Sequence, residues 1–157
     1  MIHTLDTDWA LPPLTLNQRG SWPVHDRARR NVRGVAAVWG RSLHLPVQQH
    51  VVVHMFWFVK DHRRRDADNL IATLKPFADG LVDAGIVPDD TPNFMTKHMP
   101  VIIVRKDVTP GIRFVLETTW RTGNQSRGMK IATKFHLMGK CCAYPVQITE
   151  GTDSLDA

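Results

Sequence analysis

The sequence Arg63-Arg64-Arg65-Asp66-Ala67-Asp68-Asn69-Leu70 stands where an extended segment gives way to a helical one. Before it, residues 50–59 are rich in β-branched and aromatic residues, and both alternating faces are apolar, which predicts a central strand covered on both faces. After it, apolar residues recur at helical spacing from Leu70 to Ala84, and Gly85 closes the segment, which predicts a helix over residues 69–84. The stretch therefore joins a buried strand to an amphipathic helix.

Carboxylates stand at both ends of the predicted helix. Asp66 and Asp68 are two residues apart, so an extended backbone directs both side chains to the same side. Asp68 also occupies the expected N-cap of the helix, and beyond its end come Asp89 and Asp90. Acids beside an arginine cluster suit a magnesium site that acts on phosphate. The alternative reading is a helix cap and a solvated turn, because acids are common at helix ends.

The basic run, Asp66-Ala67-Asp68-Asn69-Leu70, a helix ending in Ala84-Gly85 and the pair Asp89-Asp90 together closely resemble the RusA family of Holliday junction resolvases. The resemblance is strong over residues 62–91 and fair over about 50–117. The helix between the acids is about one turn longer than in that family. It also contains Pro76, and the extra turn is either absorbed as a kink or shifts Asp89 and Asp90 around the site. If the turn lies before Leu74, we expect Pro76 to start a fresh helical segment.

The resemblance implies an Mg²⁺-dependent endodeoxyribonuclease, with Mn²⁺ as a substitute cofactor. Such an enzyme hydrolyses phosphodiesters of Holliday junctions or related branched DNA in recombination and repair, and the family often travels with phages. It also implies a homodimer acting on a four-way junction, because two opposed strands must be cut.

In that family pattern, Asp66, Asp68 and Asp90 are the catalytic and metal-binding residues. Asp89 takes the place of Asp90 as metal ligand if the longer helix changes the register. Lys75, counted back from the glycine that ends the helix, matches a lysine that meets developing negative charge in the reaction. Its alternative is an ordinary surface lysine.

Two other functions remain open. The first is a catalytically inactive protein that binds branched DNA, and the second is a nuclease that acts on flaps or single strands. Retention of all four acids argues against the first, because a protein that only binds gains nothing from negative charge facing phosphate. Nothing in the sequence excludes the second.

Basic residues in three segments are candidates for DNA contact. The loop 17–25 mixes cations with aromatic side chains, as nucleic-acid surfaces do, although an ordinary surface loop has a similar composition. A helix expected over 26–43 carries five arginines mostly away from its apolar face, and such a face is often only solvated. The candidate DNA-binding residues are Asn17, Arg19, Arg27, Arg29, Arg30, Arg63, Arg64, Arg65 and Asn69.

The remaining elements complete an α+β domain, a mixed β-sheet flanked by helices. Residues 101–105 and 112–119 are predicted to pair as a hairpin, and residues 92–99 to form an irregular linker. Paired prolines place the segment 9–16 at a sheet edge or a strand end. His54, inside the central strand, is expected to be a satisfied core histidine rather than a ligand.

The length of 157 residues places these elements in one domain. Residues 1–120 are expected to form the endonuclease domain, and residues 121–157 a weakly structured tail, basic and then acidic. The formal charge of +5 favours a polyanionic partner. No apolar run is long enough to predict a membrane-spanning helix. The adjacent Cys141 and Cys142 make neither a disulfide framework nor a cysteine zinc site, so a cytoplasmic location is the default.

Overall fold

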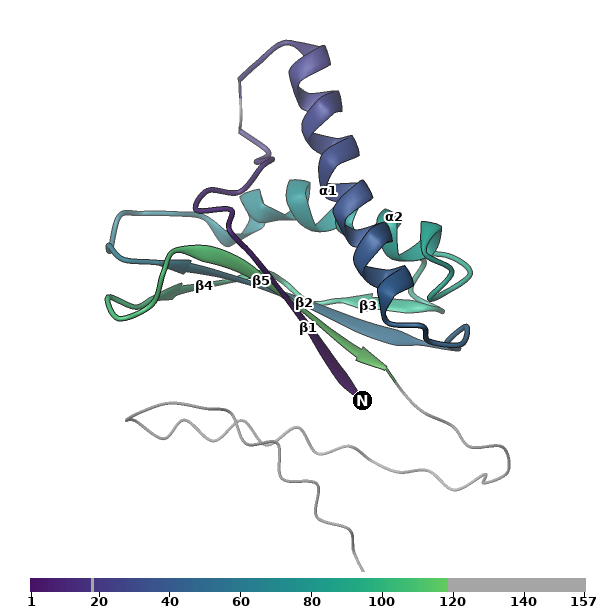
Figure 1. Cartoon of the computed structure of the whole chain (residues 1–157). Coiled ribbons are helices and arrows are strands. Elements are labelled where there is room, and N and C mark those ends of the chain that lie inside the picture. The colour runs from purple at the N-terminus through teal and green to yellow at the C-terminus, as the bar shows by residue number, and fades with distance from the viewer. Residues whose placement is uncertain (18, 119–157) are drawn as a thin grey trace, which may run out of the picture. The chain divides into compact units, whose positions relative to one another are not determined.

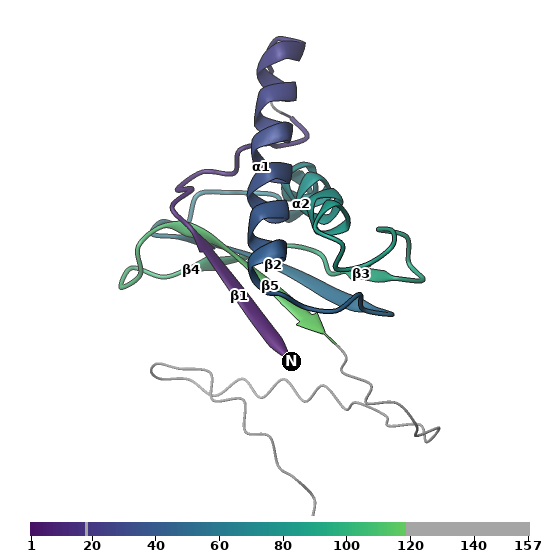
Figure 2. The ribbon, with the colours of Figure 1, turned by 45° about the vertical axis from the view of Figure 1, so that its right-hand side comes forward.

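A computed structural model of the chain describes residues 1–17 and 19–118. A five-stranded mixed sheet carries two helices on one of its faces (Figure 1, Figure 2). The elements are β1 (Ile2–Thr7), α1 (Trp22–Ser42), β2 (Val51–Val59), the 3₁₀ helix η1 (Ala67–Leu70), α2 (Ile71–Asp83), β3 (Met95–Lys97), β4 (Val101–Val104) and β5 (Gly111–Thr118). The predicted α+β class is confirmed, and the predicted tail 121–157 lies outside the described residues.

The sheet is built around β2. β5 pairs with one side of β2 in the antiparallel sense, and β1 pairs antiparallel with β5 at the sheet edge. On the other side, β3 and then β4 run parallel to β2, opposite its first and last residues. The central position predicted for residues 50–59 is confirmed.

Two predicted details of the sheet are wrong. β4 and β5 form no hairpin, because they lie on opposite sides of β2. The predicted linker 92–99 contains β3, whose three residues are too few for an alternating strand pattern to be recognised. The proline-containing segment 9–16 follows the end of the edge strand β1, Ile2–Thr7, in agreement with its predicted place at a strand end.

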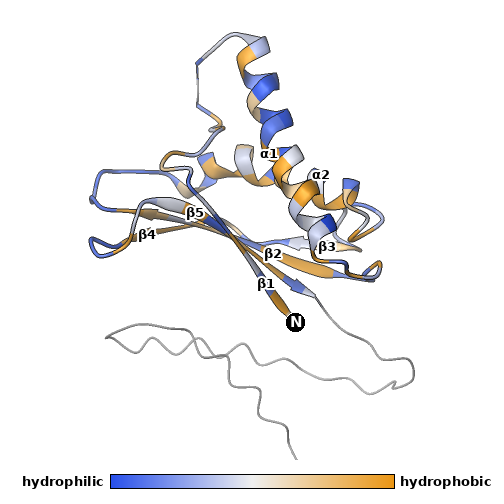
Figure 3. Cartoon of the chain, viewed as in Figure 1, coloured by the Kyte–Doolittle hydropathy of each residue, from blue (hydrophilic) through white to orange (hydrophobic). Residues whose placement is uncertain are grey.

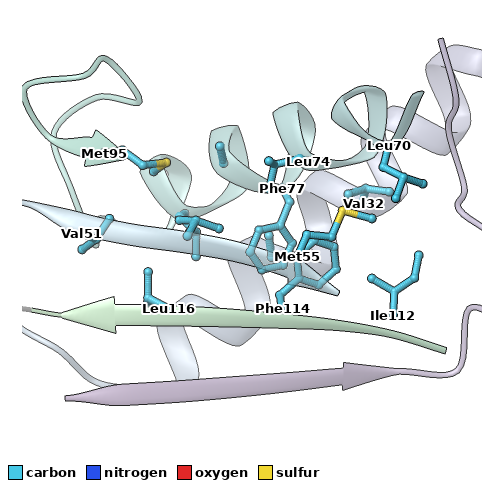
Figure 4. Packing of buried hydrophobic residues seen from close by; sticks show 14 of the residues in the cluster. Val32, Val51, Met55, Leu70, Leu74, Phe77, Met95, Ile112, Phe114 and Leu116 are labelled. Atoms are coloured by element: carbon cyan, nitrogen blue, oxygen red, sulfur yellow. The ribbon is translucent and has the colours of Figure 1, made fainter. Parts of the chain in front are cut away.

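The core lies between the sheet and the two helices (Figure 4). The odd-numbered residues of β2, from Val51 to Val59, are buried on this face. The apolar face of α2 packs on them, and the ring of Phe77 stacks on that of Phe114 in β5 with centroids 3.7 Å apart. The apolar stripe predicted for the second helix is therefore its core-facing surface.

Pro76 lies inside α2, which runs through it from Ile71 to Asp83. The expectation that Pro76 starts a fresh helical segment is therefore wrong. Leu74 and Phe77 on either side are buried, so tertiary packing outweighs the loss of one backbone hydrogen bond.

The sheet face opposite the helices is half-buried in the part of the chain that the structure describes. The even-numbered residues of β2 lie there and are partly buried, so the second face has less cover than the prediction of a strand covered on both faces implies. Contacts among side chains of this face shield them in part from solvent. The ring of His54 stacks on Phe56 and on His98, and the guanidinium of Arg113 lies over the ring of Phe58.

His54 is thus a half-buried residue of this face rather than a core residue. Its Nε2 lies 3.0 Å from Oε1 of Glu117, a contact that is an ion pair only when the imidazole is protonated. Burial lowers the pKa of His54, and His98 lowers it further, while Glu117 opposes both effects.

The two helices cross closely at Gly80 of α2. A Cβ atom at this position would overlap the backbone oxygen of Arg33 and would lie 2.6 Å from the Cβ of Ala36. Nearby, the guanidinium of Arg33 forms two hydrogen bonds with the carboxylate of Asp83. Only glycine allows the two helices to approach this closely, so Gly80 determines where α1 and α2 cross.

Candidate functional site

The helix and the acidic turn of the motif meet through Lys75 and Asp90. Nζ of Lys75 donates hydrogen bonds to Oδ2 of Asp90 at 2.6 Å and to Oδ1 of Asp79 at 2.7 Å. Asp79 lies one turn further along α2, whereas Asp90 lies 15 residues away in the turn that follows the helix. The structure therefore brings together two of the predicted catalytic residues.

A second lysine binds the same carboxylate. Nζ of Lys97, at the end of β3, lies 2.9 Å from Oδ2 of Asp90 and donates a hydrogen bond of 2.6 Å to its backbone oxygen. Lys97 was not among the predicted site residues. Its only signal in the sequence is a cation between the acidic turn and the strand 101–104, and that signal gains meaning only once β3 is known.

These contacts fix the charges of the cluster. Hydrogen bonds from Lys75 and then Lys97 hold the pKa of Asp90 below its usual range, and its side chain is 18% exposed. The hydrogen bonds of Lys75 to Asp79 and then Asp90 raise the lysine's pKa. At neutral pH Asp90 is an anion and Lys75 is a cation, which can donate a hydrogen bond but cannot take up a proton.

Asp66 and Asp68 lie at the entry to α2 and are exposed. The prediction that Asp68 caps the second helix is wrong. A 3₁₀ turn intervenes, so the N-cap of α2 is Leu70, and Asp66 at the start of η1 makes no capping hydrogen bond through its side chain. The side chains of Asp66 and Asp68 are therefore not engaged in capping. In the acidic turn, Oδ1 of Asp89 accepts a hydrogen bond from the backbone N–H of Asp90.

Within residues 1–17 and 19–118, no three His, Cys, Asp or Glu side chains are grouped so as to hold a metal ion. Mg²⁺ does not require such a cage, because it keeps several waters and is commonly held by one or two carboxylates together with substrate phosphates. The exposed carboxylates of Asp66 and Asp68 are hard oxygen donors of this kind. The donor set therefore fits Mg²⁺, with its other ligands coming from water and phosphate.

Lys75 lines two grooves. The first, of about 180 Å³, lies between α2 and residues 97–100, which connect β3 to β4. The second, of about 420 Å³, lies between α2, the first half of α1 and the segment 14–16. Both grooves also include Ile71, the residue that follows η1 with its Asp68. The lysine therefore lies one helical turn after Ile71 and borders both recesses.

The segment 14–16 is tied to α2 by hydrogen bonds. Oγ1 of Thr73 donates to the backbone oxygen of Leu14 at 2.6 Å and accepts from its N–H at 3.1 Å. The N–H of Leu16 donates to the backbone oxygen of Asn69. Asn69, a predicted DNA contact, is half-buried and supports this wall through its backbone.

The three arginines before the acids have different surroundings. Arg65 lies 2.6 Å from Asp61 and 5.1 Å from the centroid of the Trp57 ring, and its side chain is 18% exposed. It holds the loop in place. Arg63, which is 84% exposed, and the exposed Arg64 are directed to solvent.

The first half of α1 projects beyond the sheet and α2 (Figure 1, Figure 2). The buried residues of α1 all lie in its second half, from Val32 to Gly40. The projecting half is largely hydrophilic (Figure 3) and begins at Trp22, four residues earlier than predicted, because Pro23 suits the first turn of a helix. It carries the exposed Arg27, Arg29 and Arg30.

The other predicted basic contacts are also at the surface. Arg30 is 74% exposed and pairs with Asp26 at 2.8 Å, one turn earlier in α1. Asn17 and Arg19, in the segment before α1, are exposed. The predicted DNA-binding residues thus divide into exposed side chains and two that support the protein, Arg65 and Asn69.

Comparison with known proteins gives little further direction. No family model matches the chain. An uncharacterized protein of Xylella fastidiosa (strain Temecula1) is 30% identical over 88 residues, which are 53% of this chain and 58% of that protein. The chain thus matches less than two thirds of that protein's length, and this similarity indicates no activity. Within the described residues, no helix has the length and apolar character needed to cross a membrane.

Proposed function

We propose that the protein is an Mg²⁺-dependent, structure-selective endodeoxyribonuclease of the cytoplasm that resolves Holliday junctions or related branched DNA. The observation that carries the proposal is the 2.6 Å contact of Lys75 with Asp90, which joins the helix and the acidic turn of the RusA-like motif. Lys97 on the same carboxylate adds a second cation. Acids and cations side by side are what phosphodiester hydrolysis requires.

The exposed arginines would bind the DNA backbone. Arg27, Arg29 and Arg30 on the projecting half of α1, together with Arg63 and Arg64, present five guanidinium groups to solvent. Arginine forms forked hydrogen bonds with phosphate and stays charged at all relevant pH values. Such contacts position the DNA without reading its sequence.

The chemistry would take place between Lys75 and the entry to α2. Asp66 and Asp68 would hold Mg²⁺, with water and substrate phosphate as its other ligands. The chemistry that Mg²⁺ supplies in such sites is a lower pKa for a nearby water and stabilisation of charge on phosphate oxygens. Lys75 would turn from Asp90 to the phosphate and donate a hydrogen bond where negative charge develops. Lys97 would keep Asp90 in place during this exchange.

The working form would be a homodimer. A four-way junction must be cut in two opposed strands, and a two-fold dimer carries two sites in the required relation. Sedimentation of the full chain at micromolar concentration, with and without junction DNA, tests this. A monomer under both conditions would rule the dimer out.

A catalytically inactive branched-DNA-binding protein is the second candidate. It is favoured by the lack of a three-carboxylate group among the described residues. A flap or single-strand nuclease is a third reading, in which the same site accepts another DNA structure.

One experiment separates the three functions. The full chain is incubated with a synthetic mobile four-way junction, a flap and a plain duplex, each with Mg²⁺, with Mn²⁺ or with a chelator. We expect paired cuts in the junction with either metal and none with the chelator. Binding without any cut would support the inactive protein, and cutting confined to the flap would support the other nuclease.

A further inference from the structure

The larger of the two grooves is suited to hold a small ligand. This α1–α2 groove lies between the segment 14–16, His25 and Arg29 of α1, and Ala72 and Lys75 of α2, and its volume is about 420 Å³. Ligand pockets commonly measure about 300–1,000 Å³. The groove is therefore large enough for a ligand of the size of a nucleotide.

Its walls combine apolar surface with cations. Leu16 is 60% exposed and Ile71 is 38% exposed, so both present apolar surface to an incoming group. Arg29 stands on one side and Lys75 on the other, and none of the described residues that line the groove carries a carboxylate. A ligand with a flat apolar part and a negative charge matches these walls, and a nucleotide has both.

An exposed tryptophan stands on the same side of α1. Trp22, His25 and Arg29 are three and then four residues apart, which places them along one helix face. The side chain of Trp22 is 73% exposed, an unusual state for so large an apolar ring. Aromatic rings beside cations form stacking platforms in proteins that bind single-stranded nucleic acid. The neighbouring arginines favour a polyanion over an apolar protein partner.

We propose that the α1–α2 groove binds one unpaired nucleotide of branched DNA. The base would lie against the apolar wall and Trp22, and its phosphate against Arg29. This inference rests on the proposed function and names the part of the substrate that gives selectivity. Because Lys75 lines both grooves, the nucleotide would lie beside the site of cleavage. An intact duplex would have to break a base pair to fill the groove, whereas a branch point supplies unpaired nucleotides.

The test measures binding without cleavage. A fluorescently labelled oligothymidylate and a duplex of equal length are titrated with the full chain in a chelating buffer, and affinity is read from anisotropy. Ala72→Phe fills the groove from α2, whereas Val38→Phe adds the same ring type at an exposed position of α1 outside the groove. We expect Ala72→Phe to weaken single-strand binding by about 5- to 150-fold, the range for losing one stacked base, and Val38→Phe to match the wild type.

Trp22 gives a second test that leaves the groove open. Trp22→Ala should weaken single-strand binding, and Trp22→Phe should restore most of it, with duplex affinity unchanged in both. Wild-type single-strand affinity in both Ala72→Phe and Trp22→Ala would overturn the inference, even if the protein cuts junctions. If no DNA is cut but Ala72→Phe still selectively loses single-strand binding, the groove assignment stands and the nuclease proposal fails.

Discussion

Replacing Lys75 with alanine tests the link between the helix and the acidic turn. The side chain of Lys75 is 55% exposed and forms two ion pairs, with Asp79 and Asp90. Exposed pairs contribute about 0.2–1 kcal/mol each, and Asp90 keeps its contacts to Lys97 after the change. We therefore expect Lys75→Ala to lower the free energy of unfolding by no more than about 2 kcal/mol, which leaves a domain of ordinary stability folded.

The expected effect on cleavage is larger. Removal of a hydrogen-bond donor that meets developing charge typically costs about 10²- to 10³-fold in rate. The affinity for a junction should fall only modestly, as for one lost phosphate contact among several. The assay is single-turnover cleavage of a four-way junction at saturating enzyme with Mg²⁺, with thermal unfolding measured on the same protein.

Asp79→Asn is the matched control. It removes the other ion pair of Lys75 but leaves the contact of 2.6 Å with Asp90. We expect this variant to cut within a few-fold of the wild-type rate. If Lys75→Ala cuts normally at saturation, Lys75 is an ordinary surface lysine. Its assignment by counting back from Gly85 then fails. If both variants lose the same activity, the effect comes from local structure.

Three other predictions test the fold and the surface. Gly80→Ala should lower the free energy of unfolding by about 1–3 kcal/mol, because the new Cβ meets α1. Gly34→Ala is the control, since its new Cβ meets nothing within 4 Å. Chemical denaturation should show that this control is as stable as the wild type or more stable. Since the pKa of His54 is lowered on folding, stability should be fully present above about pH 6.5 and should fall as the pH drops below it. Denaturation between pH 7 and 5 should show a weaker dependence in His54→Phe, and an unchanged one would contradict the assignment. Arg30→Ala should weaken junction binding and reduce the slope of log affinity against log salt by about 1, while single-turnover cleavage at saturation stays unchanged; an unaltered slope would remove Arg30 from the DNA contacts.

The central strand and the second helix were predictable because each carries its own local pattern. Apart from His54, residues 51–59 are apolar, and the stripe through Leu74, Phe77 and Leu81 is buried as its spacing predicts. The pairing of β4 and β5 was not predictable from neighbourhood in the chain. The short connection between β4 and β5 favours a hairpin when only local sequence is considered. In the structure both strands pair with β2, which lies some forty residues before β4 in the chain.

The candidate site divides in the same way. The contact of Lys75 with Asp90 agrees with counting back from Gly85, which preserves the helical register. Lys97 was missed because its place depends on β3, a strand of three residues. The inward position of Arg65 depends on Trp57 and on the path of the loop, so three consecutive arginines looked alike in the sequence.

The central claim is that the exposed acids at the entry to α2 serve catalysis rather than binding. The most direct measurement compares Asp66→Asn and Asp68→Asn with the wild type on one four-way junction, recording cleavage with Mg²⁺ and affinity. Asp8→Asn, the same charge change at another exposed aspartate, is the control. Each of the two variants should lose cleavage while its affinity persists or rises, because a negative charge facing phosphate is removed. Cleavage by either variant at near the wild-type rate in Mg²⁺ would contradict the account.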